Sequence, residues 1–207
     1  MWVQSSGADQ PKVNAALRPG AQCHICNDMN DLKDRDGLPE ALRALLQEYP
    51  RAGWEAHPEF GHLTRFWLDR HLGFRRLMEA LRDEAEAASD GRLSPEAHAP
   101  RLGRMGNMLL GGLHEHHGVE DHHYFPRLSR LAPELGRGFE ILDADHHALD
   151  AELAGFADAA NGVLQGGEAG PLAERLAALE RFLGRHLEDE EDLIVPVILR
   201  AGEGAIG

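Results

Sequence analysis

Apolar side chains recur along this 207-residue chain at intervals of three and four, the spacing that places them on one face of an α-helix. Four long segments show this period, over about 59–89, 94–125, 133–161 and 171–196. Runs of β-branched residues with period-two alternation, which indicate strands, are scarce. The pattern predicts an all-α protein, and helices of this length with modest loops favour an antiparallel up-down-up-down four-helix bundle.

Proline, glycine and capping residues indicate where the helices begin and end. Ser94 is a suitable N-cap for the second helix, with Pro95 at the first helical position. Pro126 is expected to interrupt that helix near residue 125, because proline lacks the backbone N–H that the helix needs. The third helix is expected to end before Asn161-Gly162, and the fourth to begin at Pro171.

The N-terminal part of the chain differs from the rest. Residues 1–36 are polar, contain glycine and proline, and show no apolar period, so we interpret them as a loosely ordered, irregular N-terminal arm. A single helical domain would then cover 37–207, with a short leading helix over about 38–49 and the bundle over about 59–200.

Each of the four predicted bundle helices carries a histidine on its apolar stripe, and two helices add a glutamate one turn later. These six residues are His71, His116, Glu120, His146, His186 and Glu190. One buried histidine is usually a hydrogen-bonded structural residue. Six polar groups on four inward faces are different, because burying unpaired imidazoles and carboxylates costs several kcal/mol each. Metal ions would remove that cost by taking these groups as ligands.

The glutamate-bearing motif occurs twice. In His116-His117-Gly118-Val119-Glu120-Asp121 and in His186-Leu187-Glu188-Asp189-Glu190-Glu191, a glutamate follows the first histidine by four residues. Face to face, the two copies and the two lone histidines would suit two metal ions about 3–4 Å apart, bridged by the glutamates. A position would stay open for a small molecule. Imidazole and carboxylate favour iron, and less selectively zinc or manganese.

Several nearby residues have two interpretations. Asp150, one turn after His146, is either a seventh ligand or a solvated acid. Asp145 could reach the metal or orient an imidazole, as carboxylates beside metal ligands do. His123, one turn after Glu120 on the same stripe, is a hydrogen-bond donor or proton relay beside the ligands, or a structural histidine. Tyr124 falls near the same layer, where core packing would also explain it.

Three further histidines lie away from the apolar stripes, and one glycine lies on the stripe of the second predicted helix. His117, His122 and His147 lie about 100° away from the apolar stripes, so a solvated position at the rim is expected. Gly112 lies four residues before His116, where the second copy of the motif has Phe182. The missing side chain either opens a channel beside the metals or allows close helix packing.

Charge and composition exclude several classes of partner. The chain has 35 acidic and 21 basic residues, a formal net charge of −14, which argues against binding nucleic acid or an anionic membrane surface. No apolar run approaches the roughly 18 residues that span a bilayer, and the first residues lack the pattern of a signal peptide. These features predict a cytoplasmic protein. Two cysteines, Cys23 and Cys26, provide half a zinc site or a redox-active pair in the arm.

The arrangement His71 … His116-x-x-x-Glu120 … His146 … His186-x-x-x-Glu190 resembles the hemerythrin-like (HHE cation-binding) family over about residues 60–200. The resemblance implies a four-helix bundle around a non-haem di-iron site. His71 and His116 would then serve one iron and His146 and His186 the other, with Glu120 and Glu190 bridging.

One difference from the oxygen-carrying members of the family indicates which of its subgroups this chain resembles. Oxygen-carrying hemerythrins use a fifth histidine four residues after the ligand of the third helix, where this chain has Asp150. The four-His, two-Glu pattern is more similar to hemerythrin-like proteins of nitric-oxide and oxidative stress, including those implicated in repair of iron–sulfur centres. Those repair proteins also carry a small cysteine-bearing N-terminal region.

The sequence leaves several functions open. The first is a di-iron centre that binds or reacts with dioxygen, nitric oxide or peroxide, with or without enzymatic turnover as an oxidoreductase. The second is an oxidase or oxygenase with a small organic substrate. The third is iron storage, or iron donation to a protein partner that docks on the arm. A structural zinc bundle is the fourth, disfavoured because structural zinc sites are closed and four-coordinate.

Overall fold

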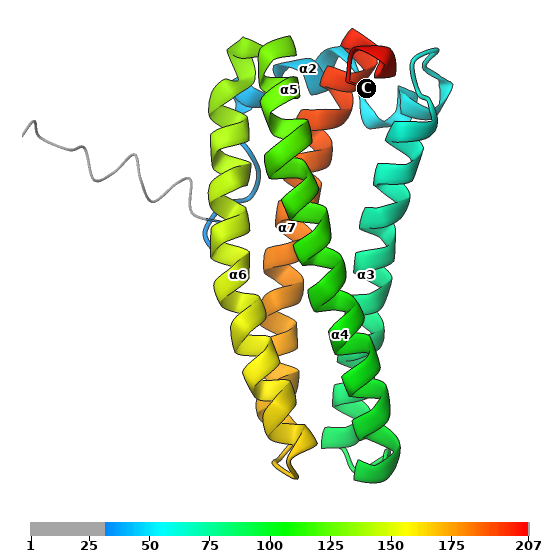
Figure 1. Ribbon diagram of the computed structural model, residues 1–207, viewed down its shortest axis with the longest axis vertical. Helices are drawn as coiled ribbons and strands as arrows, with labels where there is room; N and C mark the ends of the chain where they lie inside the picture. The colour runs from blue at the N-terminus through cyan, green and yellow to red at the C-terminus, as the bar shows by residue number, and fades with distance from the viewer. Residues whose placement is uncertain (1–31, 207) are drawn as a thin grey trace, which may run out of the picture.

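The computed structural model describes residues 32–206 of the chain. Four long helices pack side by side along its length: α3 (His62–Ser89), α4 (Pro95–Val119), α6 (Gly136–Leu164) and α7 (Gly170–Ala201). The colour gradient in Figure 1 shows that consecutive long helices run in opposite directions. No strand occurs within 32–206, and the prediction of an all-α helical bundle is confirmed.

Short elements gather at the end of the bundle where the C-terminus lies (Figure 1). They are η1 (Glu40–Arg43), α2 (Ala44–Glu48), η2 (Arg51–Ala56), α5 (Phe125–Leu131), η4 (Pro133–Leu135) and η5 (Glu203–Ala205). Since α2, α3, α5 and α6 all contact α7, the second half of α7 is enclosed, and every residue from Asp189 to Leu199 is buried. A helix enclosed in this way can present polar ligands to a closed interior.

The second long helix does not end at Pro126, contrary to the expectation from the sequence. A single π-helical turn, η3 (Glu120–Tyr124), follows α4, and the helix then continues as α5 to Leu131. The backbone N–H of Phe125 donates to the carbonyl of Glu120, five residues earlier. The turn thus holds one more residue than an α-helical turn, and α5 begins in a shifted register with Pro126 in its first turn, where a missing N–H is tolerated.

A leucine-rich core fills the bundle on the far side of the candidate site from the short elements. Leu109, Leu149, Phe156, Leu172 and Leu176 are fully buried there. Each such side chain contributes roughly 1.5–3 kcal/mol relative to an exposed one. This core fixes how the four helices meet, and therefore where their polar residues face one another.

The start of α3 is held by an acidic side chain from the C-terminal end of the chain. Glu203 accepts hydrogen bonds from the backbone N–H groups of Leu63 (3.1 Å) and Thr64 (2.7 Å) and from the Thr64 hydroxyl (2.9 Å). Burial by itself raises the pKa of Glu203, but these hydrogen bonds outweigh it and lower the pKa. Gly61, the N-cap, has no side chain to collide with the carboxylate. The contact fixes the helix that carries His71.

The stretch just before the short helices contacts the bundle. Leu32, Arg35 and Leu38 are buried, although residues 32–36 fall in the part of the sequence interpreted as an arm. Cys23 and Cys26 lie outside the described residues. Among the helices of the described part, none is long and apolar enough to cross a membrane.

Candidate metal centre

Seven side chains from the four long helices and the π turn form two adjoining groups inside the bundle. The first group contains His71, His116, Glu120 and Glu190, and the second contains His117, His146 and His186. Within each group the nitrogen and oxygen atoms that could bind a metal all lie within 4.8 Å of one another. Six of the seven residues are buried, and the side chain of His116 is 9% exposed.

Distances in the first group suit a single ion. The Nε2 atoms of His71 and His116 lie 3.0 Å apart, and the Nε2 of His116 lies 3.1 Å from Oε1 of Glu120. The Nε2 of His71 is 3.4 Å from Oε2 of Glu190. Two ligand atoms bound about 2.1 Å from one ion at roughly a right angle lie about 3 Å apart, so this spacing fits a shared metal.

The two carboxylates lie between the groups. Oε2 of Glu120 is 3.8 Å from Nε2 of His146, and Oε2 of Glu190 is 3.7 Å from Nε2 of His186. Each glutamate therefore faces histidines of both groups. This is the position from which a carboxylate can bridge two metal ions.

The second group consists of three packed imidazoles. The ring of His117 stacks on that of His146, with centroids 4.0 Å apart and planes 10° apart. The centroids of His146 and His186 are 4.8 Å apart, and those of His117 and His186 are 5.4 Å apart. Three donors from three helices thus converge beside the two carboxylates.

Unpartnered buried atoms test whether these residues fit metal ions. Within 32–206, both carboxylate oxygens of Glu120 and of Glu190 are buried and lack a hydrogen-bond partner. The same holds for Nε2 of His146 and His186 and for both ring nitrogens of His117. Leaving such groups unpaired costs about 1–3 kcal/mol each, and more for charged ones. Metal ions would use the carboxylate oxygens, the two Nε2 atoms and one ring nitrogen of His117, so the donor set fits the cations that the sequence predicts.

The protonation of these groups follows from their burial. Burial and the neighbouring Glu190 raise the pKa of Glu120 well above its ordinary value, and burial raises the pKa of Glu190. Burial and nearby imidazoles lower the pKa of His116, His117 and His186. Neutral imidazole is the form that binds metals. A bound cation would in turn favour the ionised carboxylates.

An acid on α7 orients His71. Oε1 of Glu191 lies 3.0 Å from Nδ1 of His71, leaving Nε2 to face the first group. Glu191 also accepts hydrogen bonds from Arg75 (2.7 Å) and Arg51 (2.7 Å). Burial alone would raise the pKa of Glu191, but the hydrogen bonds from His71, Arg75 and Arg51 lower it to about 2. A carboxylate behind a histidine in this way is typical of metal ligands.

Acids also lie behind two histidines of the second group. Oδ1 of Asp121 is 2.7 Å from Nδ1 of His146, and Oδ2 of Asp145 is 3.5 Å from Nδ1 of His186. Asp145 is buried and forms an ion pair with Arg35, consistent with the orienting role considered from the sequence. In each case Nε2 is the nitrogen left to face the candidate ions.

The structure brings together, in the two groups, all six ligands expected from the sequence, but it places two other residues, His117 and His123, differently. Asp150 is exposed and belongs to neither group, so it does not join the centre as a seventh ligand. His123 is exposed as well. The expectation that His123 continues the buried stripe is wrong: the π turn adds one residue to the helix, so the next buried position after Glu120 is Phe125.

His117 was expected at the solvated rim, and that expectation is wrong because this side chain is only 5% exposed. The buried stripe of the second helix consists of Leu102, Gly106, Leu109, Leu113, His117 and Glu120. Gly106 faces Phe156, where a Cβ would lie 3.4 Å from the ring. Because Gly106 has no apolar side chain, the pattern of large apolar residues does not indicate that Leu113 and His117 face inward. His122 and His147 are exposed, as expected.

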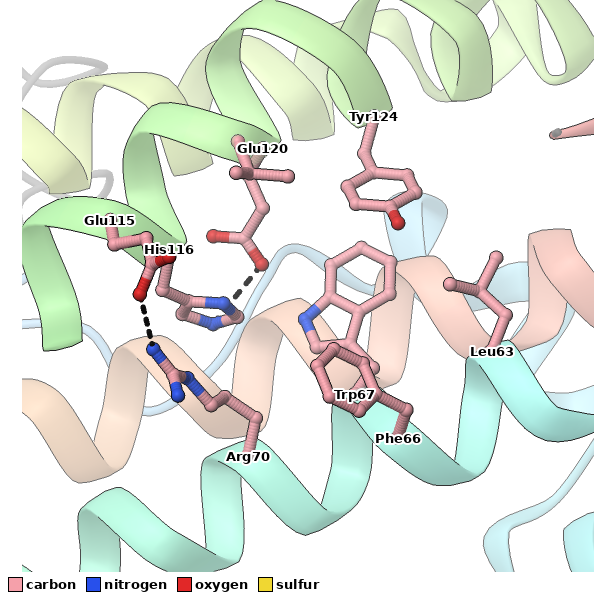
Figure 2. Close-up of a pocket in the computed structure, with 9 residues that line it drawn as sticks. Leu63, Phe66, Trp67, Arg70, Glu115, His116, Glu120 and Tyr124 are labelled. Atoms are coloured by element: carbon pink, nitrogen blue, oxygen red, sulfur yellow. Dashed lines mark hydrogen bonds and ion pairs between the residues drawn. The ribbon is translucent and has the colours of Figure 1, made fainter.

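A pocket of about 160 Å³ lies between α3 and α4 and reaches the first group at His116 and Glu120. Tyr124 lines it and packs on Trp67, with ring centroids 5.1 Å apart (Figure 2). The pocket is not formed by Gly112. A Cβ on Gly112 would lie 3.1 Å from Cε1 of Phe74, so the phenylalanine ring fills that space and close packing explains the glycine.

Together, the helical bundle and the two groups of imidazoles and carboxylates define a protein with a site suited to metal ions. Residues 62–198, more than half of the chain, match the hemerythrin family, described as the Hemerythrin HHE cation binding domain. The chain therefore belongs to the hemerythrin HHE cation-binding family. Comparisons with curated proteins and with solved structures gave no match.

Proposed function

We propose that this protein holds two iron ions bridged by Glu120 and Glu190, with an open position that binds or reacts with dioxygen, nitric oxide or peroxide. The observation that carries the proposal is the set of buried, unpartnered carboxylate oxygens lying between two groups of histidines. Imidazole and carboxylate donors are typical of non-haem iron, with zinc or manganese as less selective alternatives.

His117 extends the ligand set inferred from the sequence. We propose that it joins His146 and His186 on one ion, while His71 and His116 hold the other. The centre then has five imidazoles, the number used by oxygen-carrying hemerythrins, but the fifth comes from α4 and not from the third bundle helix. This count supports reversible binding of a small ligand among the possible functions.

The ion held by two histidines is the better candidate for the open position. It has one imidazole fewer than its neighbour, and the pocket between α3 and α4 reaches two of its ligands, His116 and Glu120. When bound there, iron would supply a site for a diatomic ligand and the capacity for electron transfer. The chain contributes fixed imidazoles, two bridging oxygen donors and an enclosed interior.

Carboxylates behind the candidate ligands support a fixed orientation of the imidazole rings. Glu191 and Asp121 accept from the Nδ1 atoms of His71 and His146, and arginines hold Glu191 in turn. Such partners fix the orientation of the ring and increase the basicity of the ligand nitrogen. Their loss typically weakens metal binding about 10- to 100-fold.

Metal analysis of the full chain, purified without added metal or a histidine tag, tests the proposal. We expect two irons per chain and an absorption spectrum that changes when azide or nitric oxide is added. Replacing the exposed His123 by alanine serves as a control and should change neither result. One metal or none per chain, or two metals that azide and nitric oxide do not affect, would contradict the proposal.

Iron donation to a partner remains a hypothesis from the sequence, because it depends on Cys23 and Cys26, outside the described residues. An oxidase or oxygenase with an organic substrate requires a pocket beside the metals. The pocket between α3 and α4 meets that requirement, and its chemistry is considered next.

A further inference from the structure

We propose that the pocket between α3 and α4 binds a neutral, single-ring aromatic compound that carries one oxygen substituent, such as a phenol. The proposal rests on the proposed function for its biological meaning, because the ring would lie beside His116 and Glu120. Binding itself depends only on side chains of α3, α4 and η3, which the structure describes without metal. The two proposals can therefore fail separately.

The size of the pocket matches one aromatic ring. Its volume is about 160 Å³. An engineered apolar cavity of about 150 Å³ in another protein binds benzene, so the space here accepts a six-membered ring and little more. A bicyclic compound would have to project into solvent.

Most of the wall of the pocket and part of its mouth are apolar. Leu63 and Trp67 line it from α3, and Tyr124 lines it from η3 (Figure 2). Phe66 is 60% exposed and Val119 is 39% exposed, and both belong to the same lining. Single exposed apolar residues are ordinary, but two at the mouth of an apolar pocket form an entrance that favours an apolar ligand.

A buried donor specifies the oxygen substituent. The indole Nε1 of Trp67 is buried, and within 32–206 no acceptor meets it with full hydrogen-bond geometry. It faces the Glu120 carboxyl at the inner end of the pocket, and this interaction acts to lower the pKa of that group. Figure 2 shows this nitrogen on the side of the pocket where His116 and Glu120 lie. A hydroxyl oxygen on the ring can accept from the indole N–H, while the ring lies against the aromatic walls. A ligand without an oxygen would leave the N–H with the Glu120 carboxyl as its acceptor and no second one.

The charges at the rim favour a neutral ligand. The cation at the pocket, Arg70, already donates to Glu115 (3.1 Å) and to the carbonyl of Gly112 (3.4 Å). Figure 2 shows the ion pair at the edge of the pocket. Glu120 adds a buried carboxyl group at the inner end, and the whole chain carries a net charge of −14. An aromatic carboxylate would lose its hydration without finding an unpaired cation.

Fluorine NMR with 4-fluorophenol as the probe tests this proposal on the full chain, both as purified and after treatment with a chelator. We expect saturable binding in both samples and at least tenfold weaker binding of 4-fluorobenzoate, a difference of about 1.4 kcal/mol. Equal or tighter binding of the carboxylate would overturn the claim of a neutral ligand. No saturable binding of 4-fluorophenol in either sample would overturn the site itself.

Three variants locate the binding. Val119→Trp fills the mouth of the pocket and should abolish binding, whereas Met108→Trp, at a more exposed position of α4 outside the pocket, should not. Trp67→Phe keeps an aromatic wall but removes the donor, so affinity should fall about two- to tenfold. Helix content measured by circular dichroism verifies that each variant is folded.

The pattern of results separates this proposal from the di-iron centre. If 4-fluorophenol binds the wild type but not Val119→Trp, and the protein as purified contains no iron, the results would support the pocket and contradict the proposed function. Two irons per chain with no binding of 4-fluorophenol would support the di-iron centre and contradict the pocket. Binding that survives Val119→Trp in a folded variant would place the probe elsewhere and overturn the proposal.

Discussion

Replacing His117 with leucine distinguishes a metal ligand from a structural histidine, because the two roles predict opposite effects on the metal-free protein. His117 is 5% exposed, and neither ring nitrogen has a hydrogen-bond partner among the described residues. A buried polar group without a partner costs about 1–3 kcal/mol, and leucine, which is similar in size, removes that cost. We therefore expect metal-free His117→Leu to be more stable than the metal-free wild type by that amount.

The same substitution should weaken metal binding. Loss of a residue that only orients a ligand already lowers metal affinity about 10- to 100-fold. His117 belongs to the group with His146 and His186, so its loss removes one of three imidazoles and should cost at least that much. A hundredfold loss is about 2.8 kcal/mol. Since metal that binds only the folded state stabilises it by mass action, the metal-loaded variant should be less stable than the metal-loaded wild type.

Urea denaturation with and without a chelator, combined with metal analysis after dialysis, measures both effects. His147→Leu is the matched control. Like His117, this residue directly follows a candidate ligand in the sequence, but it is exposed, so its loss should leave stability and metal content unchanged. A metal-free His117→Leu protein less stable than metal-free wild type, or a variant that keeps two metals with unchanged affinity, would contradict the role of His117 as a metal ligand.

Three further predictions concern the surroundings of the centre. Arg35→Met removes the buried cation that pairs with Asp145 and Asp189, although Asp189 keeps its ion pair with Arg185. The loss of this buried pair should lower the free energy of unfolding by about 3–5 kcal/mol; urea denaturation checks this against the exposed control Lys33→Met, and a loss below about 1 kcal/mol would contradict it. Because the pKa of Glu203 is lowered in the folded state, its stabilisation is present above the ordinary value of 4.5 and is lost as the pH falls through the lowered value. The difference in unfolding free energy between wild type and Glu203→Gln should therefore shrink on acidification below pH 4.5, and a difference that grows would count against the cap. A Cβ added by Gly111→Ala would meet open space, so this variant should have a higher melting temperature, from a gain of about 1 kcal/mol in helix propensity. A Cβ added by Gly112→Ala would press on the Phe74 ring, so this variant should gain less stability. Equal gains in the two variants would contradict close packing at Gly112.

The bundle and most of the centre were predictable because their signals are local and periodic. His71, His146 and His186 each lie on a continuous stripe of large apolar residues, so the helical period alone places them inside. The repeated His-x-x-x-Glu motif adds Glu120 and Glu190 at the same depth. Spacing within one helix is enough for these predictions.

Two errors in the second helix arose where the periodic signal was interrupted. Gly106 occupies a core position without an apolar side chain, which hid the stripe that leads through Leu113 to His117. The π turn after Glu120 then moved the inward face by one residue, and His123 became exposed. The stripe could have been found by allowing glycine in the core, but the π turn has no clear signature in this sequence.

Three polar contacts around the centre, made by Asp121, Glu191 and Arg35, were not predicted from the sequence, for two different reasons. Asp121 follows Glu120 directly and Glu191 follows Glu190, and each of the two acids lies behind a histidine of another helix. An acid after the glutamate in both copies of the motif was therefore an available signal. The contact of Arg35 with Asp145 joins residues 110 positions apart, and only the packed structure reveals such a pair.

Diffraction from crystals of the full chain at the iron absorption edge shows directly whether two irons lie inside the bundle. We expect two anomalous peaks about 3.5–4 Å apart, one beside His71 and His116 and the other beside His117, His146 and His186, with Glu120 and Glu190 reaching both. A single peak, or no peak among these side chains in iron-supplied protein, would contradict the di-iron centre.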